Sequence, residues 1–187
     1  MAFLTFAGSD REESVNWLAA SLVSTAVSEL GHAVESQRLE TLNLPLYSQG
    51  TEQSTGYPSS LRDFRLSVQK ADGLIIGCPE FNGLITPLLL NALTWLTRSD
   101  QGAPDLSAFR LKPVLICSSS PGGLGGIRAA AELANYLRGI GAIVFPEFFI
   151  VPQAFSVFSE PNLASDHPLT VRANEIALAF TELAKKV

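Results

Sequence analysis

Residues 73–87 read GLIIGCPEFNGLITP, and this stretch is the strongest indication of the fold class in the sequence. It begins with a nearly continuous apolar run, Gly73 to Cys78, of the kind found in central parallel strands that are covered on both faces. A polar loop follows, and Pro87 then stands at the first position of a helix expected to run to about Leu96, a position that suits proline. The stretch therefore predicts a strand, a loop and a helix in direct succession.

The same succession recurs on both sides of these residues. It is typical of parallel strands joined by crossover helices, which pack on the faces of the sheet. We therefore expect a three-layer α/β sandwich with a five-stranded parallel sheet and helices on both faces, formed by residues 1–187 as a single domain. The other expected strands are Ala2–Ala7, Ala33–Leu39 at a sheet edge, Pro113–Cys117 and Ala142–Phe145, and the other expected helices are Val15–Leu30 with Ser14 as its N-cap, Ser59–Gln69, Ile127–Leu137 and Leu169–Lys185.

The composition excludes several classes of protein. The chain of 187 residues is 47% apolar and 17% charged, which is the composition of a globular protein and not of a disordered one. Its net charge of -5 argues against a broad basic surface for nucleic acid, although an acidic protein can still bind one phosphate locally. The nearest candidate for a membrane helix, Leu84–Leu96, is interrupted by proline and polar residues. No signal peptide is recognisable, so we expect a cytoplasmic protein.

The cysteines and histidines show no metal-binding pattern. Cys78 and Cys117 are far apart in the sequence, and no CxxC occurs. The two histidines, His32 and His167, lack the spacing of zinc ligands. We therefore expect no metal site, and two buried thiols in a reducing compartment.

A possible phosphate site lies in the loop at residues 8–14, GSDREES, which joins the first expected strand to a helix N-terminus. Its backbone N–H groups, the hydroxyls of Ser9 and Ser14 and the guanidinium of Arg11 could bind a phosphate, aided by the helix dipole. The loop matches neither the P-loop pattern nor the G-x-G-x-x-G dinucleotide pattern. An ordinary capped turn would use the same residues, and three carboxylates in the loop would repel a phosphate: Asp10, Glu12 and Glu13.

Two more loops follow central strands, and in sheets of this type ligands bind at the carboxyl ends of the strands. In the loop at residues 78–86, a planar heterocycle could stack on Phe81 while Asn82 bonds its edge, although Phe81 could equally fill the core and Asn82 form a turn. The loop at residues 118–126 has four glycines, Gly122, Gly123, Gly125 and Gly126, which would let a flat ligand or a second backbone come close. Together the three loops predict a slot with an anion site at one end and a stacking surface at the other.

These loops resemble those of the NADPH-dependent FMN reductase family, flavodoxin-like flavoproteins that include quinone, azo and chromate reductases. The family motif G-S-L-R-x-x-S-x-N is matched by GSDREESVN at residues 8–16, and P-E-Y-N is matched by PEFN at residues 79–82, where phenylalanine replaces tyrosine. A serine pair before M-G-x-x-G-G is matched by SSPGGLGG at residues 119–126. The resemblance runs from Phe3 to about Ile150.

The resemblance implies a flavodoxin-like fold with strand order 2-1-3-4-5 and a bound FMN. It places the phosphate in the first motif, the isoalloxazine ring against the second, and the third motif along the border of the flavin. The cofactor-binding residues that it implies are Ser9, Arg11, Ser14, Val15, Asn16, Pro79, Glu80, Phe81, Asn82, Ser119 and Gly122.

The implied activity is an NAD(P)H oxidoreductase. Hydride would pass from NADPH or NADH to FMN, and electrons would pass on to a small acceptor such as a quinone, an azo compound, free flavin or a metal oxyanion. The flavin does the chemistry, so no catalytic side chain is required, and Glu80 fits a structural or exposed role better than that of an acid. One alternative is a flavodoxin-type electron carrier or FMN-binding module without turnover, and another is an interaction protein whose acidic loop no longer binds flavin.

Two apolar segments predict a homodimer or homotetramer. Leu84–Leu96 is strongly apolar, and Phe148–Phe158 lies in an aromatic and proline-rich stretch, residues 148–163, that has no clear periodicity. Together they contain more apolar side chains than one surface should expose. We expect this second stretch to be an ordered excursion from the sheet.

Overall fold

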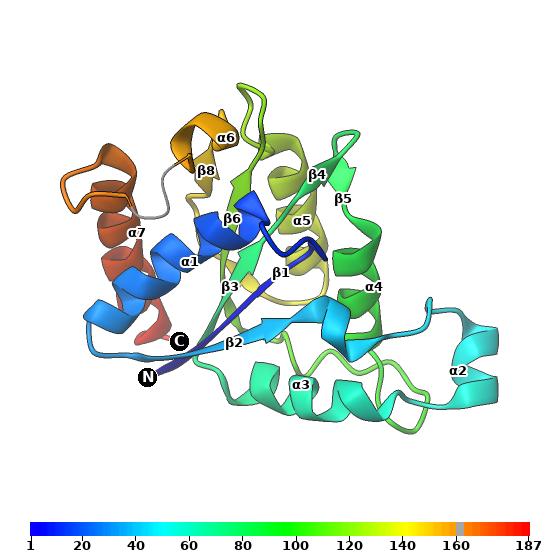
Figure 1. Cartoon of the computed structure of the whole chain (residues 1–187). Helices are drawn as coiled ribbons and strands as arrows, with labels where there is room; N and C mark the ends of the chain where they lie inside the picture. The colour runs from blue at the N-terminus through cyan, green and yellow to red at the C-terminus, as the bar shows by residue number, and fades with distance from the viewer. Residues whose placement is uncertain (160–162) are drawn as a thin grey trace.

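The computed structural model describes residues 1–159 and 163–187. Its main sheet is parallel, with the order β2-β1-β3-β6-β7 and with β8 paired to β6 (Figure 1). The strands are β1 (Ala2–Ala7), β2 (Ala33–Arg38), β3 (Gly73–Gly77), β6 (Pro113–Ser119), β7 (Ile143–Val144) and β8 (Phe149–Val151), and a separate hairpin is formed by β4 (Glu80–Phe81) and β5 (Leu84–Ile85). The predicted fold class and strand order are confirmed.

Helices cover both faces of this sheet, as expected (Figure 1). One face packs against α1 (Val15–Glu29) and α7 (Pro168–Ala184), through a cluster centred on Phe3, Ile75 and Phe180. The other face packs against α3 (Ser59–Lys70), α4 (Pro87–Leu96) and α5 (Ile127–Gly139), in a cluster that contains Leu74, Ile116 and Trp95. The remaining helical segments are η1 (Leu39–Leu42), α2 (Gln49–Thr55) and α6 (Ala154–Val157).

The expected fifth strand, Ala142–Phe145, is found as β7 within one residue at each end, but the sequence did not predict β8. Two short strands share its place beside β6, because β7 pairs with Pro113 and Val114 whereas β8 pairs with residues 117–119. Pro146 lies between them and has no N–H to donate, so the chain leaves the sheet there and returns at Phe149. The stretch from residue 148 is thus partly regular, with β8 and α6, and residues 160–162 of the expected excursion lie outside the described residues.

The helix at the first loop begins where the sequence predicted. The side chain of Ser14 accepts a hydrogen bond from the Trp17 amide at 3.3 Å, which makes Ser14 the N-cap of α1. At the other end of α1, Gly31 adopts a positive φ of 85° as the chain turns toward β2. The helix therefore points its N-terminus at the carboxyl ends of the strands.

Neither a membrane-spanning helix nor a metal cluster is found among the described residues. No helix there is long and apolar enough to cross a bilayer. No group of three or more His, Cys, Asp or Glu side chains is arranged to hold a metal ion. Cys78 and Cys117 are both buried free thiols, and burial raises the pKa of Cys78 to about 12, so this thiol stays protonated at neutral pH.

Candidate functional site

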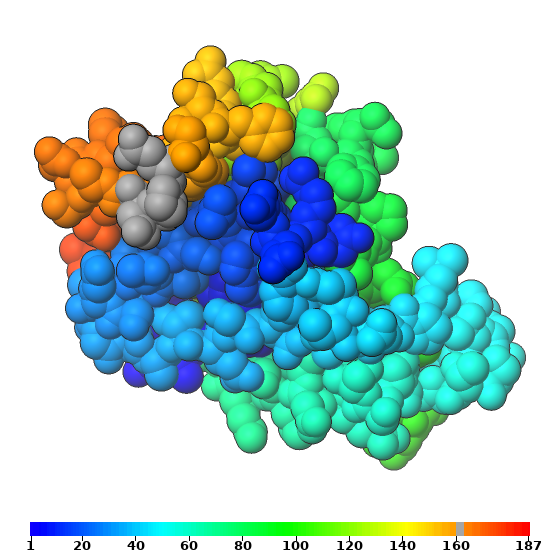
Figure 2. Space-filling model, viewed as in Figure 1, coloured from blue at the N-terminus to red at the C-terminus, as the bar shows by residue number. Residues whose placement is uncertain are grey.

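The three loops predicted from the sequence lie together at the carboxyl ends of β1, β3 and β6. Figure 2 shows them in the upper half of the view, with the first loop in blue near the middle of the visible face, the β4–β5 hairpin in green and the loop at residues 118–126 in yellow-green. Each follows a different strand of the parallel sheet, so the topology brings them to the same edge. We refer to residues 8–16, 78–86 and 118–126 together as the loop rim.

Buried hydrogen bonds join the first and third loops. Asn16, which is 3% exposed, donates from Nδ2 to the Ser119 carbonyl at 2.9 Å and accepts from the Ser119 amide at 2.8 Å. The Ser119 hydroxyl donates to the Val151 carbonyl at 2.9 Å. The resemblance assigned both residues to the flavin, and in the structure these polar groups bind one another and β8, so they hold the two loops together.

The second loop is joined to both of the others. The Ser118 hydroxyl donates to the Cys78 carbonyl at 2.6 Å, and the Thr86 hydroxyl donates to the Gly8 carbonyl at 2.7 Å. Ser118 is fully buried and Thr86 is 2% exposed, so water does not compete for these bonds. Sequence reasoning did not single out these two side chains, because a serine after a strand and a threonine before a helix are common in ordinary turns.

The first loop keeps several backbone donors open. Among the described residues, the amides of residues 9, 10, 12 and 13 donate to no protein acceptor, whereas the Arg11 amide bonds the Ser9 hydroxyl at 3.4 Å. Arg11 is exposed and Ser9 is partly exposed, while Val15 is buried beneath them in the first turn of α1. Open amides at a helix N-terminus are the physical basis of anion binding.

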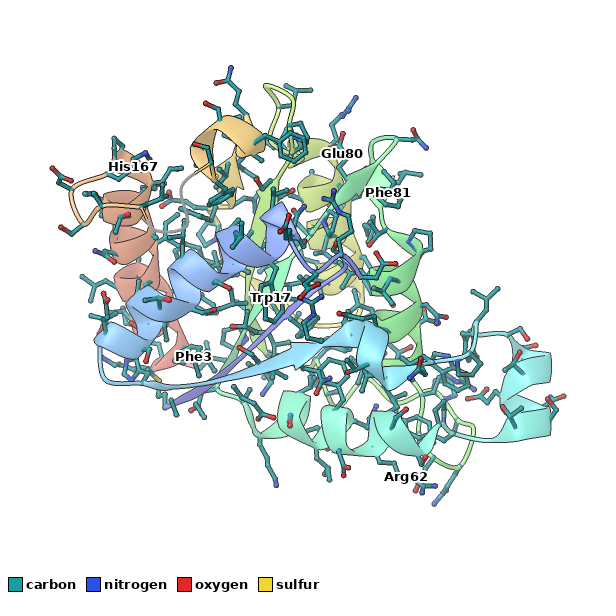
Figure 3. All side chains as sticks on the ribbon, in the orientation of Figure 1. Phe3, Trp17, Arg62, Glu80, Phe81 and His167 are labelled. Carbon is teal, nitrogen blue, oxygen red and sulfur yellow. The ribbon has the colours of Figure 1, made fainter. Side chains whose placement is uncertain are left out.

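The second loop is a hairpin with an exposed aromatic side chain. Asn82 and Gly83 both have positive φ, 54° and 85°, as a two-residue hairpin turn of the Asn-Gly type requires. Phe81 is 61% exposed on this hairpin, and Figure 3 shows it at the loop rim. The interpretation of Phe81 as core filling is therefore wrong, whereas Asn82 does form a turn. Pro79, between β3 and the hairpin, is buried.

Glu80 is tied to helix α5 and does not point to a free site. Its carboxylate accepts from Nε of Arg128 at 2.9 Å and from the Ala129 amide at 3.3 Å, in the first turn of α5. Burial of the carboxyl opposes ionisation, but the hydrogen bonds from Arg128 and Ala129 lower the pKa of Glu80 below its usual value. Glu80 is therefore an ionised structural group at neutral pH and holds the hairpin against α5.

The glycines of the third loop divide into two pairs. Gly125 and Gly126 have positive φ, and a Cβ on Gly126 would overlap the Ser118 hydroxyl. Both are thus required by the protein's own packing. A Cβ on Gly123 would meet nothing within 4 Å, and one on Gly122 only the Ser120 hydroxyl at 3.9 Å, so these two leave open space beside the rim.

The loop rim fits FMN by these observations. A phosphate needs several N–H donors with a cation nearby, and the first loop has open amides and Arg11. A planar ring needs an uncovered aromatic surface and a backbone without side chains, and Phe81 and the Gly122–Gly123 segment supply these. Ser9, Arg11, Phe81, Asn82 and Gly122 are the predicted ligands that remain accessible to a bound flavin.

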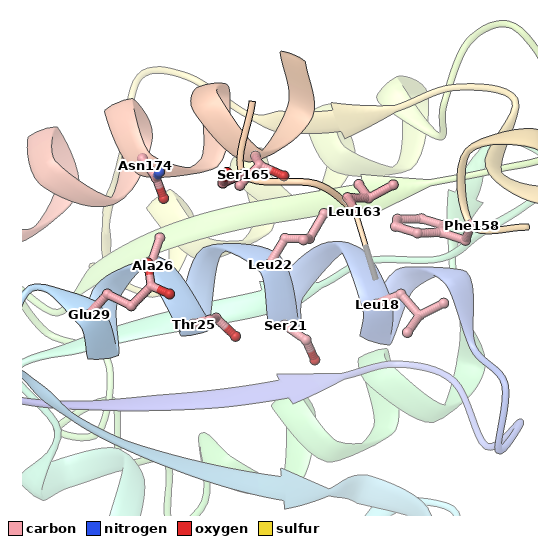
Figure 4. A pocket seen from close by; sticks show the side chains of 11 residues that line it. Leu18, Ser21, Leu22, Thr25, Ala26, Glu29, Phe158, Leu163, Ser165 and Asn174 are labelled. Carbon is pink, nitrogen blue, oxygen red and sulfur yellow. The ribbon is translucent and has the colours of Figure 1, made fainter. Parts of the chain in front are cut away.

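One groove of the described residues lies outside this rim. It has a volume of about 440 Å³ and lies between α1 and α7, lined by Leu22, Thr25, Phe158 and Asn174 among others (Figure 4). Its walls carry Glu29 and no cation. It therefore lacks the cation that would favour a phosphate there.

Comparisons with known proteins agree with the loop motifs. The chain matches the family described as NADPH-dependent FMN reductase over residues 1–156. It is 32% identical to a quinone reductase of Escherichia coli K12 over 88% of this chain and 87% of that protein. It is 30% identical to a 2-hydroxy-1,4-benzoquinone reductase of Burkholderia sp. over 85% of this chain and 83% of that protein.

A solved structure shows the same fold. FerB, a flavoenzyme NAD(P)H:(acceptor) oxidoreductase from Paracoccus denitrificans, superposes with a TM-score of 0.74 over 99% of this chain and 97% of that chain, at 23% identity. Because the family match covers most of the sequence and includes all three loops, the protein belongs to the NADPH-dependent FMN reductase family.

Proposed function

We propose that this protein is an FMN-dependent reductase that takes electrons from NADPH or NADH and passes them to a small acceptor such as a quinone. The observation that carries this proposal is the contrast inside the loop rim. Its buried polar groups are bonded to each other, whereas the amides of the first loop, Arg11 and Phe81 stay open. Such a rim is preorganised for a ligand with an anionic end and a flat end. The family membership and the named relatives support the same activity.

The residues of the rim divide the work of binding. The open amides, Ser9 and Arg11 would hold the phosphate, and Phe81 and Asn82 would contact the ring and its edge. Asn16, Ser118 and Ser119 keep the loops in register. FMN, when bound, supplies the hydride and electron transfer itself, so the protein's tasks are to hold it, to leave one face accessible and to admit nicotinamide and acceptor in turn.

The rim also supports the expected homo-oligomer, although the apolar surface that could form its interface is smaller than the sequence indicated. Much of Leu84–Leu96 is buried within the chain, and so is Phe149, so these segments expose less apolar surface than expected. Several large apolar side chains around the rim are nevertheless 44–63% exposed, and a second copy of the chain would cover them: Phe81, Leu84, Leu124, Ile127 and Phe155. Sedimentation that shows only a 20.0 kDa species would contradict the oligomer. The buried free thiols fit the reducing cytoplasm.

The decisive experiment is anaerobic reduction of the FMN-loaded protein. Addition of NADPH or NADH should abolish the visible flavin absorbance within seconds to minutes, and a quinone should restore it. A protein that is reduced only by a separate reductase would be an electron carrier instead. Loaded protein that keeps its colour with both nucleotides would refute the reductase.

The phosphate assignment has its own test, with a matched control. Arg11→Ala should raise the FMN dissociation constant about tenfold, because it removes a charge-assisted hydrogen bond. Arg62→Ala removes the same charge from an exposed position on α3, away from the rim (Figure 3), and should leave it unchanged. Equal constants for wild type and Arg11→Ala would contradict the assignment.

A further inference from the structure

Arg38 connects the edge strand to the first loop of the rim. It is the last residue of β2 and lies opposite Ala7 in the parallel register of β1, directly before the loop begins. Its guanidinium donates from Nη2 to the carbonyl of Arg11 at 3.1 Å, in the middle of the loop. The side chain therefore spans from the strand to the backbone of the residue whose own side chain was predicted to bind phosphate.

Two further contacts fix the Arg38 side chain. Its Nε donates to Oε1 of Glu40 at 2.5 Å, and its guanidinium carbon lies 5.4 Å from the centre of the Trp17 ring. Trp17 belongs to the first turn of α1, where its amide bonds the N-cap Ser14. Arg38 thus contacts the middle of the loop and the helix that ends it, with only 30% of its side chain exposed.

The bond to the Arg11 carbonyl has a consequence for the next amide. In a trans peptide the carbonyl and the following N–H point in opposite directions. With the Arg11 carbonyl directed to Arg38, the N–H of Glu12 is directed away from Arg38, and among the described residues it has no protein acceptor. Arg38 therefore fixes the direction of one of the open donors of the loop.

We propose that Arg38 is a positioning residue that holds the first loop in the form that binds a flavin phosphate. The proposal rests on the proposed function and extends it to a residue outside the three motifs. Because Glu40 neutralises much of its charge, Arg38 acts through the geometry of its contacts more than through its charge. The first loop carries three exposed carboxylates that repel a phosphate, those of Asp10, Glu12 and Glu13. Fixed N–H donors are therefore needed to hold a phosphate in this loop.

The test compares FMN with riboflavin, which has the same ring and lacks the phosphate. Dissociation constants are measured by fluorescence titration of the wild type, Arg38→Met, Arg38→Lys and the control Arg62→Met. Arg38→Met keeps an unbranched side chain beside Trp17 and should weaken FMN about tenfold. The riboflavin affinity should stay within about twofold of the wild-type value, because the lost contact between Arg38 and the Arg11 carbonyl acts at the phosphate end. Arg62→Met should change neither constant.

Arg38→Lys distinguishes geometry from charge. Lysine keeps the charge but lacks the planar fork that contacts Glu40 and the Arg11 carbonyl together, so it should restore the FMN affinity only in part. Full restoration would show that charge alone is needed and would overturn the positioning role. Equal loss of FMN and riboflavin in Arg38→Met, or no loss of either, would also overturn it. A wild type that binds neither flavin would refute the proposed function itself, which is a separate outcome.

Discussion

The loop rim and the segment that follows α4 both contain polar and charged groups, but they differ in whether those groups are hydrogen-bonded within the protein. The segment at residues 97–112 is fastened by two arginines. Arg65 donates to the carbonyls of Leu96 and Arg98, to Asp105 at 2.6 Å and to Ser107 at 3.2 Å. Here the charged groups of Arg65 and Asp105 are bonded inside the protein, whereas the rim leaves donors open to solvent.

The second arginine, Arg98, shows the same closure. It forms a two-bond pair with Glu52 on α2, at 2.8 and 2.9 Å, and also donates to the Gly102 carbonyl. The hydrogen bond from Arg98 is the main reason that the pKa of Glu52 lies below its usual value, against the effect of burial. A charged residue near a loop therefore indicates a ligand site only when its hydrogen-bonding groups are not already paired with other groups of the protein.

Among the variants that test this difference, Arg65→Met should have the largest effect, which is a loss of stability. Loss of the guanidinium leaves the Leu96 and Arg98 carbonyls without the donor that they share and removes the cation paired with Asp105, so the free energy of unfolding should fall by about 3 kcal/mol. FMN affinity should not change, since the site lies elsewhere. Urea denaturation and flavin titration measure the two quantities, with Arg62→Met as the exposed control. A large loss of FMN affinity in folded Arg65→Met would show that the two regions are not independent.

The next largest effects should distinguish Gly126, which the protein's own packing requires, from Gly123, which borders open space. Gly126→Ala places a Cβ on the Ser118 hydroxyl at a φ of 84°, and should destabilise the protein by about 2 kcal/mol. Gly123→Ala meets no protein atom within 4 Å and should keep its stability within about 0.5 kcal/mol. If the space beside Gly123 receives the flavin, Gly123→Ala should still weaken FMN several-fold. Unchanged FMN binding in Gly123→Ala would place the ring elsewhere.

The smallest effect concerns Glu80 and depends on pH. Because its folded pKa is lowered, ionised Glu80 stabilises the protein above its unfolded pKa of about 4.3, and this contribution is lost as the pH falls through the folded value. Glu80→Gln should therefore cost about 1 kcal/mol at pH 7 and almost nothing at the acidic end. Thermal denaturation of both proteins from pH 7 downward measures the difference. A difference that grows on acidification would reverse the sign expected here.

The sequence predicted local elements well and long-range contacts poorly. The strand at Gly73–Gly77, the helix at Pro87–Leu96 and the Ser14 cap follow from apolar runs and end signals within a few residues. The sequence did not predict β8, because Pro146 ends the pairing of the fifth strand and the chain rejoins β6 only at Phe149.

Within the site, sequence reasoning found the loops but not the bonds between them. Asn16 and Ser119 were both expected at the flavin, yet they bind one another across 103 positions in the sequence, and no local pattern signals such a pair. Arg38 lies outside every motif and reaches Arg11 only because β2 lies beside β1. Partners of this kind are set by the register of the sheet.

Hydrogen exchange measured by mass spectrometry, with and without FMN, tests the central claim most directly. The account predicts that FMN protects the amides of residues 8–16, 79–84 and 118–126, and leaves residues 49–57 and 97–107 unchanged. Protection is expected to be strongest at residues 9, 10, 12 and 13, whose amides have no protein acceptor among the described residues. Protection confined to residues 49–57 and 97–107, or the absence of any change in the loop rim, would contradict the claim that this rim is the flavin site.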